Sequence, residues 1–376
     1  MVDQFERLFS PIRLGSFTAP NRIMVPGHIP GMADDEDLGL PNERLIAYWE
    51  SKAKGGAGII TSGGMGVHPS AMMYSFGDTG KALDRLALAA ETIKKHDSRF
   101  LIQLWHFGGQ AYGTTVGHQP WSASAVPPLG GSAVPHEMTR DEIKEVIEAF
   151  ASAAVLCQKA GCDGVELHGA HSYLFCQFMS PYTNKRTDEY GGDMEGRMRF
   201  TMETIDAVRA AVGSDYTVGI RINGDEFIEG GYNLEDMKQM APMMAETGKL
   251  DFIDVSTGGL QALAPMYIPS GHSVYLASEI KQVVDIPVCA IGRINDPIQA
   301  ENILKDNHAD VICMNRALIC DPELPRKARE NRLEEIRCCL ACSEGCWQRL
   351  SQDRHPQGIS CTYNPTVGME SIPGWL

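Results

Sequence analysis

The sequence predicts an α/β protein whose core is a (β/α)8 TIM barrel. Short apolar, β-branched runs alternate with longer helical patterns, and eight such pairs follow one another without interruption. The runs are almost continuously apolar, as expected for parallel strands that are covered on both faces. The expected strands are 22–26, 58–63, 100–105, 164–168, 217–223, 252–256, 287–292 and 310–315.

Helical patterns fill the intervals, and cap residues support several of their boundaries. Thr139 and Glu142 form the capping-box pattern before a long amphipathic segment. Asn233 and Asn295 stand where N-caps are expected, and Pro297 falls in a first helical turn. The expected helices are 42–55, 80–96, 139–160, 195–212, 234–247, 275–284, 296–306 and 322–331.

The competing fold is a doubly wound open sheet. That fold calls for a Gly-x-Gly-x-x-Gly turn after an early strand, and the sequence contains none. Three long segments, 106–138, 170–194 and 257–274, follow expected strands, on the side where barrel active sites are built. We expect the barrel to occupy residues 1–335 and a C-terminal extension to occupy residues 336–376.

Composition narrows the class of protein. The 376 residues are 43% hydrophobic and 22% charged, and the formal net charge is −15. This charge argues against nucleic acid and anionic membrane surfaces as partners. No apolar run reaches membrane-spanning length, and the first residues do not form a secretory signal. Eleven cysteines without such a signal indicate reduced thiols in a cytoplasm.

Four cysteines gather after the last expected helix, at Cys339, Cys342, Cys346 and Cys361. Four thiolates are the usual ligands of a [4Fe–4S] cluster. A zinc ribbon normally has two separated Cys-x2-Cys pairs, whereas here the second half contributes one cysteine. The spacing favours an iron–sulfur cluster and leaves zinc, or no metal, as alternatives. Cys338 is adjacent and could compete as a ligand.

The fourth expected strand ends in a polar group of residues at the catalytic side of the barrel. His168 and His171 are three residues apart, and Tyr173 follows two residues later. Imidazole N–H groups can hold a carbonyl or carboxylate oxygen, and a tyrosine hydroxyl can deliver a proton. The alternative interpretation is a metal-binding pair or hydrogen-bonded core histidines.

The seventh and eighth expected strands end in Gly292-Arg293 and Asn315-Arg316. Backbone N–H groups after these two strands form the usual phosphate site of such barrels, and two arginines could clamp a phosphate. Surface salt bridges are the alternative role for both arginines. Gln103 on the third strand and Arg221 on the fifth would point into the barrel mouth, where a flavin pyrimidine ring offers matching partners.

These motifs together resemble the old yellow enzyme superfamily, and within it the iron–sulfur branch with 2,4-dienoyl-CoA reductase, 2-enoate reductases and trimethylamine dehydrogenase. The resemblance covers nearly the whole chain. It is carried by segments 8–15, 20–23, 103–106, 168–173 and 184–192, by Arg197, Gly292, Arg293, Asn315 and Arg316, and by the four cysteines.

The resemblance implies FMN at the barrel mouth and a [4Fe–4S] cluster on the four cysteines. Gln103 and Arg221 match the family's contacts to the flavin ring. The phosphate site matches Gly292, Arg293, Asn315 and Arg316. His168 and His171 match the pair that binds an enone or enoate oxygen, and Tyr173 matches the proton donor.

Two departures from the family pattern bear on the cofactors. His28 stands about where trimethylamine dehydrogenase carries a cysteine bonded to FMN, so we expect dissociable FMN, with His28 near the flavin N5 or packed. The gap before Cys361 is longer than the family's usual gap, which makes its assignment weaker than that of the other three cysteines.

The sequence therefore favours an ene-reductase, in which reduced FMN reduces the C=C bond of an α,β-unsaturated carbonyl or carboxylate. Multidomain relatives continue into FAD- and NAD(P)H-binding domains, and without a glycine-rich turn we do not expect these 376 residues to bind a dinucleotide in that way. We expect electrons to arrive through the cluster from an electron-transfer flavoprotein or from an FAD/NAD(P)H-binding subunit or domain. NAD(P)H would then be an indirect donor. We also expect a homo-oligomer and a small-molecule substrate.

Two rival functions stay open. An amine dehydrogenase or N-demethylase would oxidise a methylated amine and export electrons through the cluster. The aromatic residues that could cage its cation are Trp105, Tyr112, Trp121, Tyr267 and Tyr275. A pure electron-transfer subunit would have no use for His168, His171 and Tyr173 at the mouth.

Overall fold

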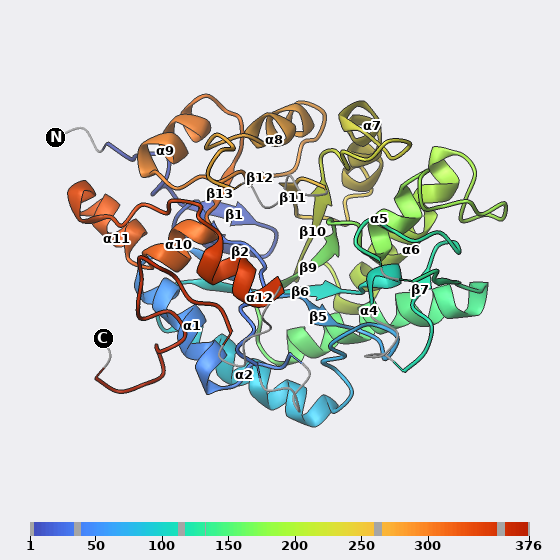
Figure 1. Cartoon of the computed structure of the whole chain (residues 1–376), viewed down its shortest axis with the longest axis horizontal. Helices are drawn as coiled ribbons and strands as arrows, with labels where there is room; N and C mark the ends of the chain where they lie inside the picture. Colours follow the sequence, from blue (N-terminus) through green and yellow to red (C-terminus); the bar gives the residue numbers. More distant parts are fainter. Residues whose placement is uncertain are drawn as a thin grey trace.

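Eight parallel strands close into a barrel surrounded by helices (Figure 1). The computed structural model describes residues 4–33, 39–111, 117–131, 133–258, 265–351 and 358–374. Each barrel strand pairs with its neighbours, and the last strand pairs with the first to complete the ring, which confirms the expected fold. The barrel strands are β3 (Ile23–Val25), β4 (Ile59–Thr61), β6 (Arg99–Trp105), β9 (Gly164–Gly169), β10 (Thr217–Asn223), β11 (Phe252–Ser256), β12 (Val288–Ala290) and β13 (Val311–Cys313).

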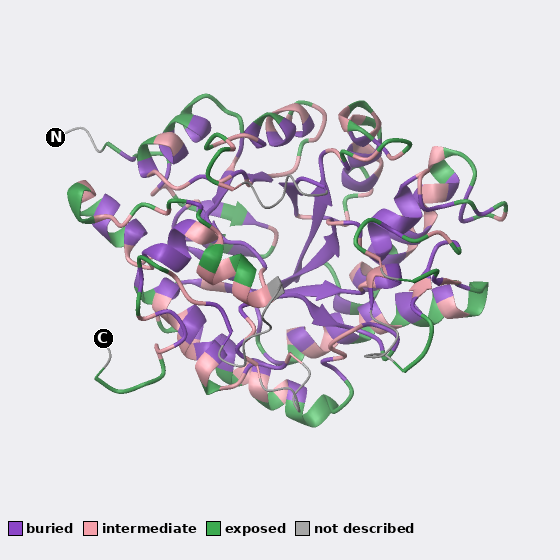
Figure 2. Cartoon of the chain, viewed as in Figure 1, coloured by how far each residue is buried: buried purple, intermediate pink, exposed green. Residues whose placement is uncertain are grey.

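A helix follows each barrel strand, with bounds close to the expected ones. Two short helices, α5 (Leu174–Met179) and α10 (Arg316–Cys320), lie within segments expected to be irregular. Figure 2 shows buried residues along the barrel strands and exposed residues on the outer helix faces. The eight expected helices are α1 (Glu43–Lys54), α2 (Thr79–Lys94), α4 (Arg140–Lys159), α6 (Met194–Val212), α7 (Leu234–Ala245), α8 (Val274–Lys281), α9 (Pro297–Lys305) and α11 (Leu324–Arg329).

The predicted caps are confirmed at two helices and wrong at a third. Thr139 forms a full capping box with Glu142, and Asn233 accepts from two backbone N–H groups at the start of α7. At α9 the N-cap is Asp296, whose carboxylate accepts from the Ile298 N–H at 2.9 Å. The Asn295 side chain instead donates to the Cys339 carbonyl at 2.8 Å, because it faces the cysteine segment.

A hairpin that the sequence did not predict closes the N-terminal end of the barrel. Strands β1 (Ile12–Leu14) and β2 (Phe17–Ala19) pair antiparallel around Gly15. Their apolar side chains form a small core with residues of the barrel strands, including Leu101 and Phe252. This core leaves the C-terminal ends of the strands as the open mouth.

The C-terminal segment lies against the barrel beside α1 and α10 (Figure 1). The Ile359 N–H donates to the Pro30 carbonyl at 2.8 Å, and the Asn364 amide donates to the Ile319 carbonyl at 2.9 Å. Asp321, wholly buried, accepts from the Lys327 ammonium at 2.7 Å and from the Arg337 backbone N–H at 3.0 Å. Asp321 therefore anchors the start of the cysteine segment.

No helix in the described part of the chain combines the length and the apolar character needed to cross a bilayer.

Replacing Asp321 with Ala should lower the free energy of unfolding by about 3–5 kcal/mol, because the Lys327 charge would remain buried without its partner. Denaturant unfolding measures this change. The matched control is Asp206→Ala, which removes an exposed ion pair with Lys249 and should cost about 0–1 kcal/mol. Equal losses in the two variants would contradict the anchoring role.

Candidate active site

The end of β9 brings His168, His171 and Tyr173 together at the barrel mouth, as the sequence predicted. The ring centroids of His168 and His171 are 5.0 Å apart, and those of His168 and Tyr173 are also 5.0 Å apart. Tyr173 is the N-cap of α5, so the turn from strand to helix fixes its position. The three rings form one cluster that can face a single ligand.

His171 is held in an unusual backbone conformation by three neighbouring elements. Its φ of 60° lies in the left-handed region, where a non-glycine residue needs support from its surroundings. Its N–H donates to the Asn223 side chain at 3.0 Å, and its carbonyl accepts from Gln110 at 2.7 Å. Its Nε2 lies 2.9 Å from the Ser256 hydroxyl. These contacts leave Nδ1 of the ring for a ligand.

Both imidazoles are neutral at physiological pH. Burial lowers the pKa of His168 and of His171 well below the usual value, and the Arg221 charge lowers both further. The Ala170 N–H donates to Nδ1 of His168 at 3.4 Å, so Nε2 carries the proton. His168 therefore presents an N–H donor, not a cation.

Two aromatic side chains from the end of β6 complete the mouth. Trp105 and Phe107 contact Tyr173 edge-on, with centroid distances of 5.0 and 5.1 Å. The Trp105 ring lies nearly parallel to His168, and its buried indole N–H has no hydrogen-bond partner among the described residues. Among the described members of the expected aromatic set, Trp105 is thus the one that lines this cluster.

The other expected cage residues lie elsewhere. Trp121 packs against His68 with a centroid distance of 5.3 Å. Tyr267 and Tyr275 are exposed, and Tyr112 lies outside the described residues.

Gln103 and Arg221 meet beneath the loop that follows β3. The Arg221 guanidinium donates to the Gly27 carbonyl at 3.0 Å, and a Cβ on Gly27 would lie 2.5 Å from the Gln103 amide nitrogen. Gln103 also donates to Glu166 at 2.7 Å, and Arg221 pairs with Asp254 at 3.3 Å. A buried amide and guanidinium at a barrel mouth fit the pyrimidine edge of a flavin.

His28 lies beside this pair with both ring nitrogens engaged. Nδ1 donates to the Pro26 carbonyl at 3.0 Å, so Nε2 accepts from the Tyr48 hydroxyl at 2.7 Å. Burial lowers the pKa of His28 to about 4. His28 therefore packs at the mouth without a spare N–H donor.

The ends of β12 and β13 lie side by side and carry the expected phosphate residues. Gly292 has φ of 153°, and a Cβ there would lie 2.6 Å from the Ser273 hydroxyl, so only glycine fits. Asn315 is the N-cap of α10, and its buried side-chain oxygen has no partner among the described residues. This glycine turn beside a helix start suits a phosphate.

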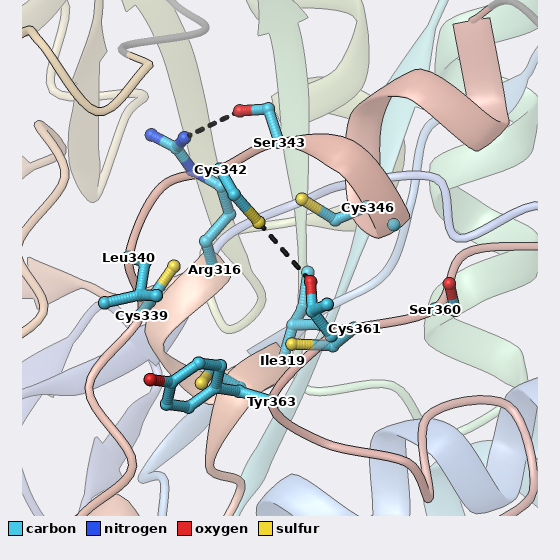
Figure 3. Close-up of a pocket in the computed structure, with 13 residues that line it drawn as sticks. Arg316, Ile319, Cys339, Leu340, Cys342, Ser343, Cys346, Ser360, Cys361 and Tyr363 are labelled. Atoms are coloured by element: carbon cyan, nitrogen blue, oxygen red, sulfur yellow. Dashed lines mark hydrogen bonds between the residues drawn. The ribbon is translucent and has the colours of Figure 1, made fainter.

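The two arginine side chains do not form a joint clamp. Arg293 donates to the Met266 carbonyl at 3.0 Å and to the Ile268 carbonyl, which lie in the loop after β11. Arg316 donates to the Ser343 hydroxyl at 3.4 Å and faces the cysteines (Figure 3). Arg316 therefore lies between the phosphate residues and the cysteine cavity.

The four expected cysteines line one cavity. Figure 3 shows their sulfur atoms arranged around it. Burial raises the pKa of Cys339 and Cys346, while the nearby Arg316 lowers both. Among the described residues, no three His, Cys, Asp or Glu side chains gather closely enough to hold a single metal ion.

A fifth cysteine, Cys320 at the end of α10, also lines this cavity and was missed from the sequence. Its thiol hydrogen-bonds to Cys361 and lowers the pKa of Cys361 to about 6. Cys338, the competitor considered from the sequence, is exposed and lies outside the cavity lining. Only the fold brings Cys320, which is far away in the sequence, to the other four.

Comparison with known proteins identifies the family. Residues 7–335 match the family model described as the NADH:flavin oxidoreductase / NADH oxidase family. The chain belongs to this family. It is a flavin-dependent oxidoreductase of the old yellow enzyme superfamily, and FMN is the flavin that the family binds.

Two relatives cover the chain almost completely. NADH oxidase from Thermoanaerobacter brockii is 40% identical over 99% of this chain and 58% of its own length. Cinnamate reductase from Clostridium sporogenes is 30% identical over 100% of this chain and 60% of its own length. This chain of the NADH:flavin oxidoreductase family thus spans somewhat more than half the length of these relatives.

Two solved structures share the fold. A 2-naphthoyl-CoA reductase complex has a TM-score of 0.92 and 29% identity, over 98% of this chain and 58% of the other. Histamine dehydrogenase from Rhizobium sp. 4-9 has a TM-score of 0.87 and 28% identity, over 98% of this chain and 53% of the other.

The lowered histidine pKa values predict acid sensitivity of this flavoprotein. Below about pH 6.5 the two imidazoles bind protons in the unfolded chain but stay neutral in the folded protein. The free energy of unfolding therefore falls as pH falls through that value. The double variant His168→Asn/His171→Asn should lose about 1–3 kcal/mol less than the wild type between pH 7 and 5.5. Denaturant unfolding at both pH values measures this difference, and parallel losses would contradict it.

Proposed function

We propose that the chain reduces the C=C bond of an α,β-unsaturated carbonyl or carboxylate with FMN and a [4Fe–4S] cluster. The observation that carries the proposal is the ring cluster of His168, His171 and Tyr173 beside Gln103 and Arg221. Two neutral N–H donors and one hydroxyl suit a neutral or anionic oxygen and an adjacent carbon that needs a proton.

The residues that would hold FMN divide into two groups. Gln103 and Arg221 would bind the ring, with His28 packed beside it. Gly292, Arg293, Asn315 and Arg316 would bind the phosphate mainly through their backbone N–H groups, with the Asn315 side chain beside them. Bound flavin supplies hydride and single-electron chemistry.

The substrate oxygen would accept from Nε2 of His168 and from Nδ1 of His171. Because both rings are neutral, they polarise the oxygen by hydrogen bonding and do not transfer a proton to it. Tyr173 would donate its hydroxyl proton to the α-carbon. Trp105 and Phe107 would exclude water from the reacting face.

The cysteine cavity supports an iron–sulfur cluster over zinc. Zinc–thiolate bonds of about 2.3 Å would bring four sulfurs close around one point. Here the four thiols of Cys339, Cys342, Cys346 and Cys361 line one pocket without a second Cys-x2-Cys pair, and four thiolates are the usual ligands of a four-iron cluster. In this proposal residues 1–335 form the flavin barrel and 336–376 the cluster extension.

The relatives' names support the direction and the source of electrons. Cinnamate reductase and 2-naphthoyl-CoA reductase are named for substrates with C=C bonds conjugated to a carbonyl group. The name NADH oxidase supports a nicotinamide donor, acting through an FAD/NAD(P)H-binding unit or an electron-transfer flavoprotein. We propose a small-molecule substrate and a homo-oligomer for this chain as well.

The second candidate is oxidation of a methylated amine, with electrons leaving through the cluster. The likeness to histamine dehydrogenase favours it, as do the aromatic faces of Trp105, Phe107 and Tyr173, which could hold a cation. Methylated amines added anaerobically would then bleach the flavin without another reductant. Alkenes that reoxidise the reduced flavin would favour the first candidate.

Replacing Tyr173 with Phe should slow flavin reoxidation by enones or enoates by a factor of about a hundred to ten thousand, because the proton donor is lost. Reduction of the flavin by dithionite should keep its wild-type rate. Stopped-flow absorbance measures both half-reactions.

The matched control is Tyr216→Phe at the opposite end of the barrel, which removes a buried hydroxyl that has no hydrogen-bond partner in the described part of the chain. This variant should reoxidise at the wild-type rate. An unchanged rate in the Tyr173→Phe variant would exclude Tyr173 as the proton donor.

Replacing Cys361 with Ala should remove most of the iron and acid-labile sulfide, because the cluster would lose one of four ligands. The Cys338→Ala variant should keep the wild-type content, since Cys338 lies outside the cavity lining. Iron and sulfide assays of anaerobically purified protein measure this. Retained iron in the first variant would point to Cys320 as the fourth ligand.

A further inference from the structure

Three charged side chains are buried beneath the proposed flavin ring. Glu166 on β9 and Asp254 on β11 are wholly inaccessible, and Arg221 on β10 is 6% exposed. Arg221 is opposite Asp254 of β11 in the sheet register, whereas its partner on β9 is His168, two residues after Glu166. None of the steps proposed above uses either carboxyl.

The two carboxyl groups have different partners. Arg221 forms an ion pair with Asp254 at 3.3 Å, whereas Glu166 accepts from the neutral Gln103 amide at 2.7 Å. Glu166 Oε2 is buried and has neither a hydrogen-bond nor an ion-pair partner among the described residues, whereas Asp254 Oδ2 lacks a hydrogen bond but has the Arg221 charge beside it. One guanidinium can balance one carboxylate, and an uncompensated buried carboxylate is costly.

The other titratable groups around Glu166 do not supply a second positive charge that could balance an ionised Glu166. His168, two residues along the same strand, is neutral, and burial raises the pKa of Cys289 on β12 and Cys313 on β13. Burial, reinforced by the Asp254 charge, raises the pKa of Glu166 to about 8. Of these groups, Arg221 therefore supplies the single positive charge for the two carboxyl groups.

We propose that Glu166 is a positioning residue that stays protonated beneath the flavin at neutral pH, orients the Gln103 amide and eases flavin reduction. This inference rests on the proposed binding of the flavin ring by Gln103 and Arg221. Because Gln103 gives one N–H to Glu166, its oxygen and second N–H remain available to the ring.

The effect on reduction follows from charge. Flavin bound at Gln103 and Arg221 would gain negative charge when it is reduced, and an ionised Glu166 nearby would oppose that charge. Reduction therefore raises the proton affinity of Glu166. Above about pH 8, reduction by dithionite or a nicotinamide donor takes up one further proton from solvent onto this carboxyl.

The test is the flavin midpoint potential as a function of pH, measured anaerobically on FMN-loaded protein between about pH 6 and 10. In the wild type, the potential should fall more steeply with pH above about pH 8. In the isosteric Glu166→Gln variant this extra steepness should disappear, because no proton can be taken up there. The exposed Glu148→Gln variant, a matched control on α4, should follow the wild type.

A second measurement needs no flavin in the variant. The wild type at pH 7 should show an infrared C=O stretch of a buried protonated carboxylic acid, which Glu166→Gln should lack. Superimposable potential curves, or the same carboxylic-acid band in both proteins, would overturn the inference while leaving alkene reduction by the wild type intact. A wild type that retains no FMN would overturn the flavin placement itself.

Discussion

The pairing of β13 with β3 is the constraint on which the arrangement of both sites depends. Ile312 and Cys313 pair with Ile23 and Met24, which closes the ring of parallel strands. Closure places the first loop of the chain beside the last loops, although they are some 290 residues apart in sequence. Without it, the ring-binding residues, the phosphate residues and the cysteine segment would have no common edge.

The loop after β3 shows what this closure achieves. At one end, Gly27 contacts Gln103 and accepts from Arg221. At the other end, the Pro30 carbonyl accepts from Ile359 of the cysteine segment. Arg316 makes the second link, because it begins α10 beside the phosphate residues while its side chain faces the cysteines. The cysteine segment therefore packs directly onto the elements that carry the proposed flavin-binding residues.

The sequence was sufficient for features set by local pattern. Continuous apolar runs located all eight barrel strands, and the strand ends located His168, His171 and Tyr173. The sequence was insufficient where a tertiary contact decides which of two adjacent residues takes a role. Asn295 and Asp296 are both good caps, and only the docking of Cys339 against Asn295 decides between them. The three-residue strands of the N-terminal hairpin are too short to show a periodic pattern.

Contacts between residues that are far apart in the sequence could not be predicted either. Cys320 joins the other cysteines because α10 ends at their cavity, and no spacing rule connects it with Cys361. The Arg293 side chain binds loop carbonyls that the strand pattern did not place near it. The resemblance to a known family supplied roles for single residues, whereas the fold supplied the network of Glu166, Arg221 and Asp254 behind them.

The central claim is that one polypeptide holds a flavin at the barrel mouth and an iron–sulfur cluster on its C-terminal cysteines. The most direct test is the absorbance spectrum of anaerobically purified protein, with FMN, iron and acid-labile sulfide quantified on the same sample. The account predicts flavin bands over a broad cluster absorption, with about one FMN and about four irons per chain. A colourless protein, or one that carries zinc on those thiols, would contradict it.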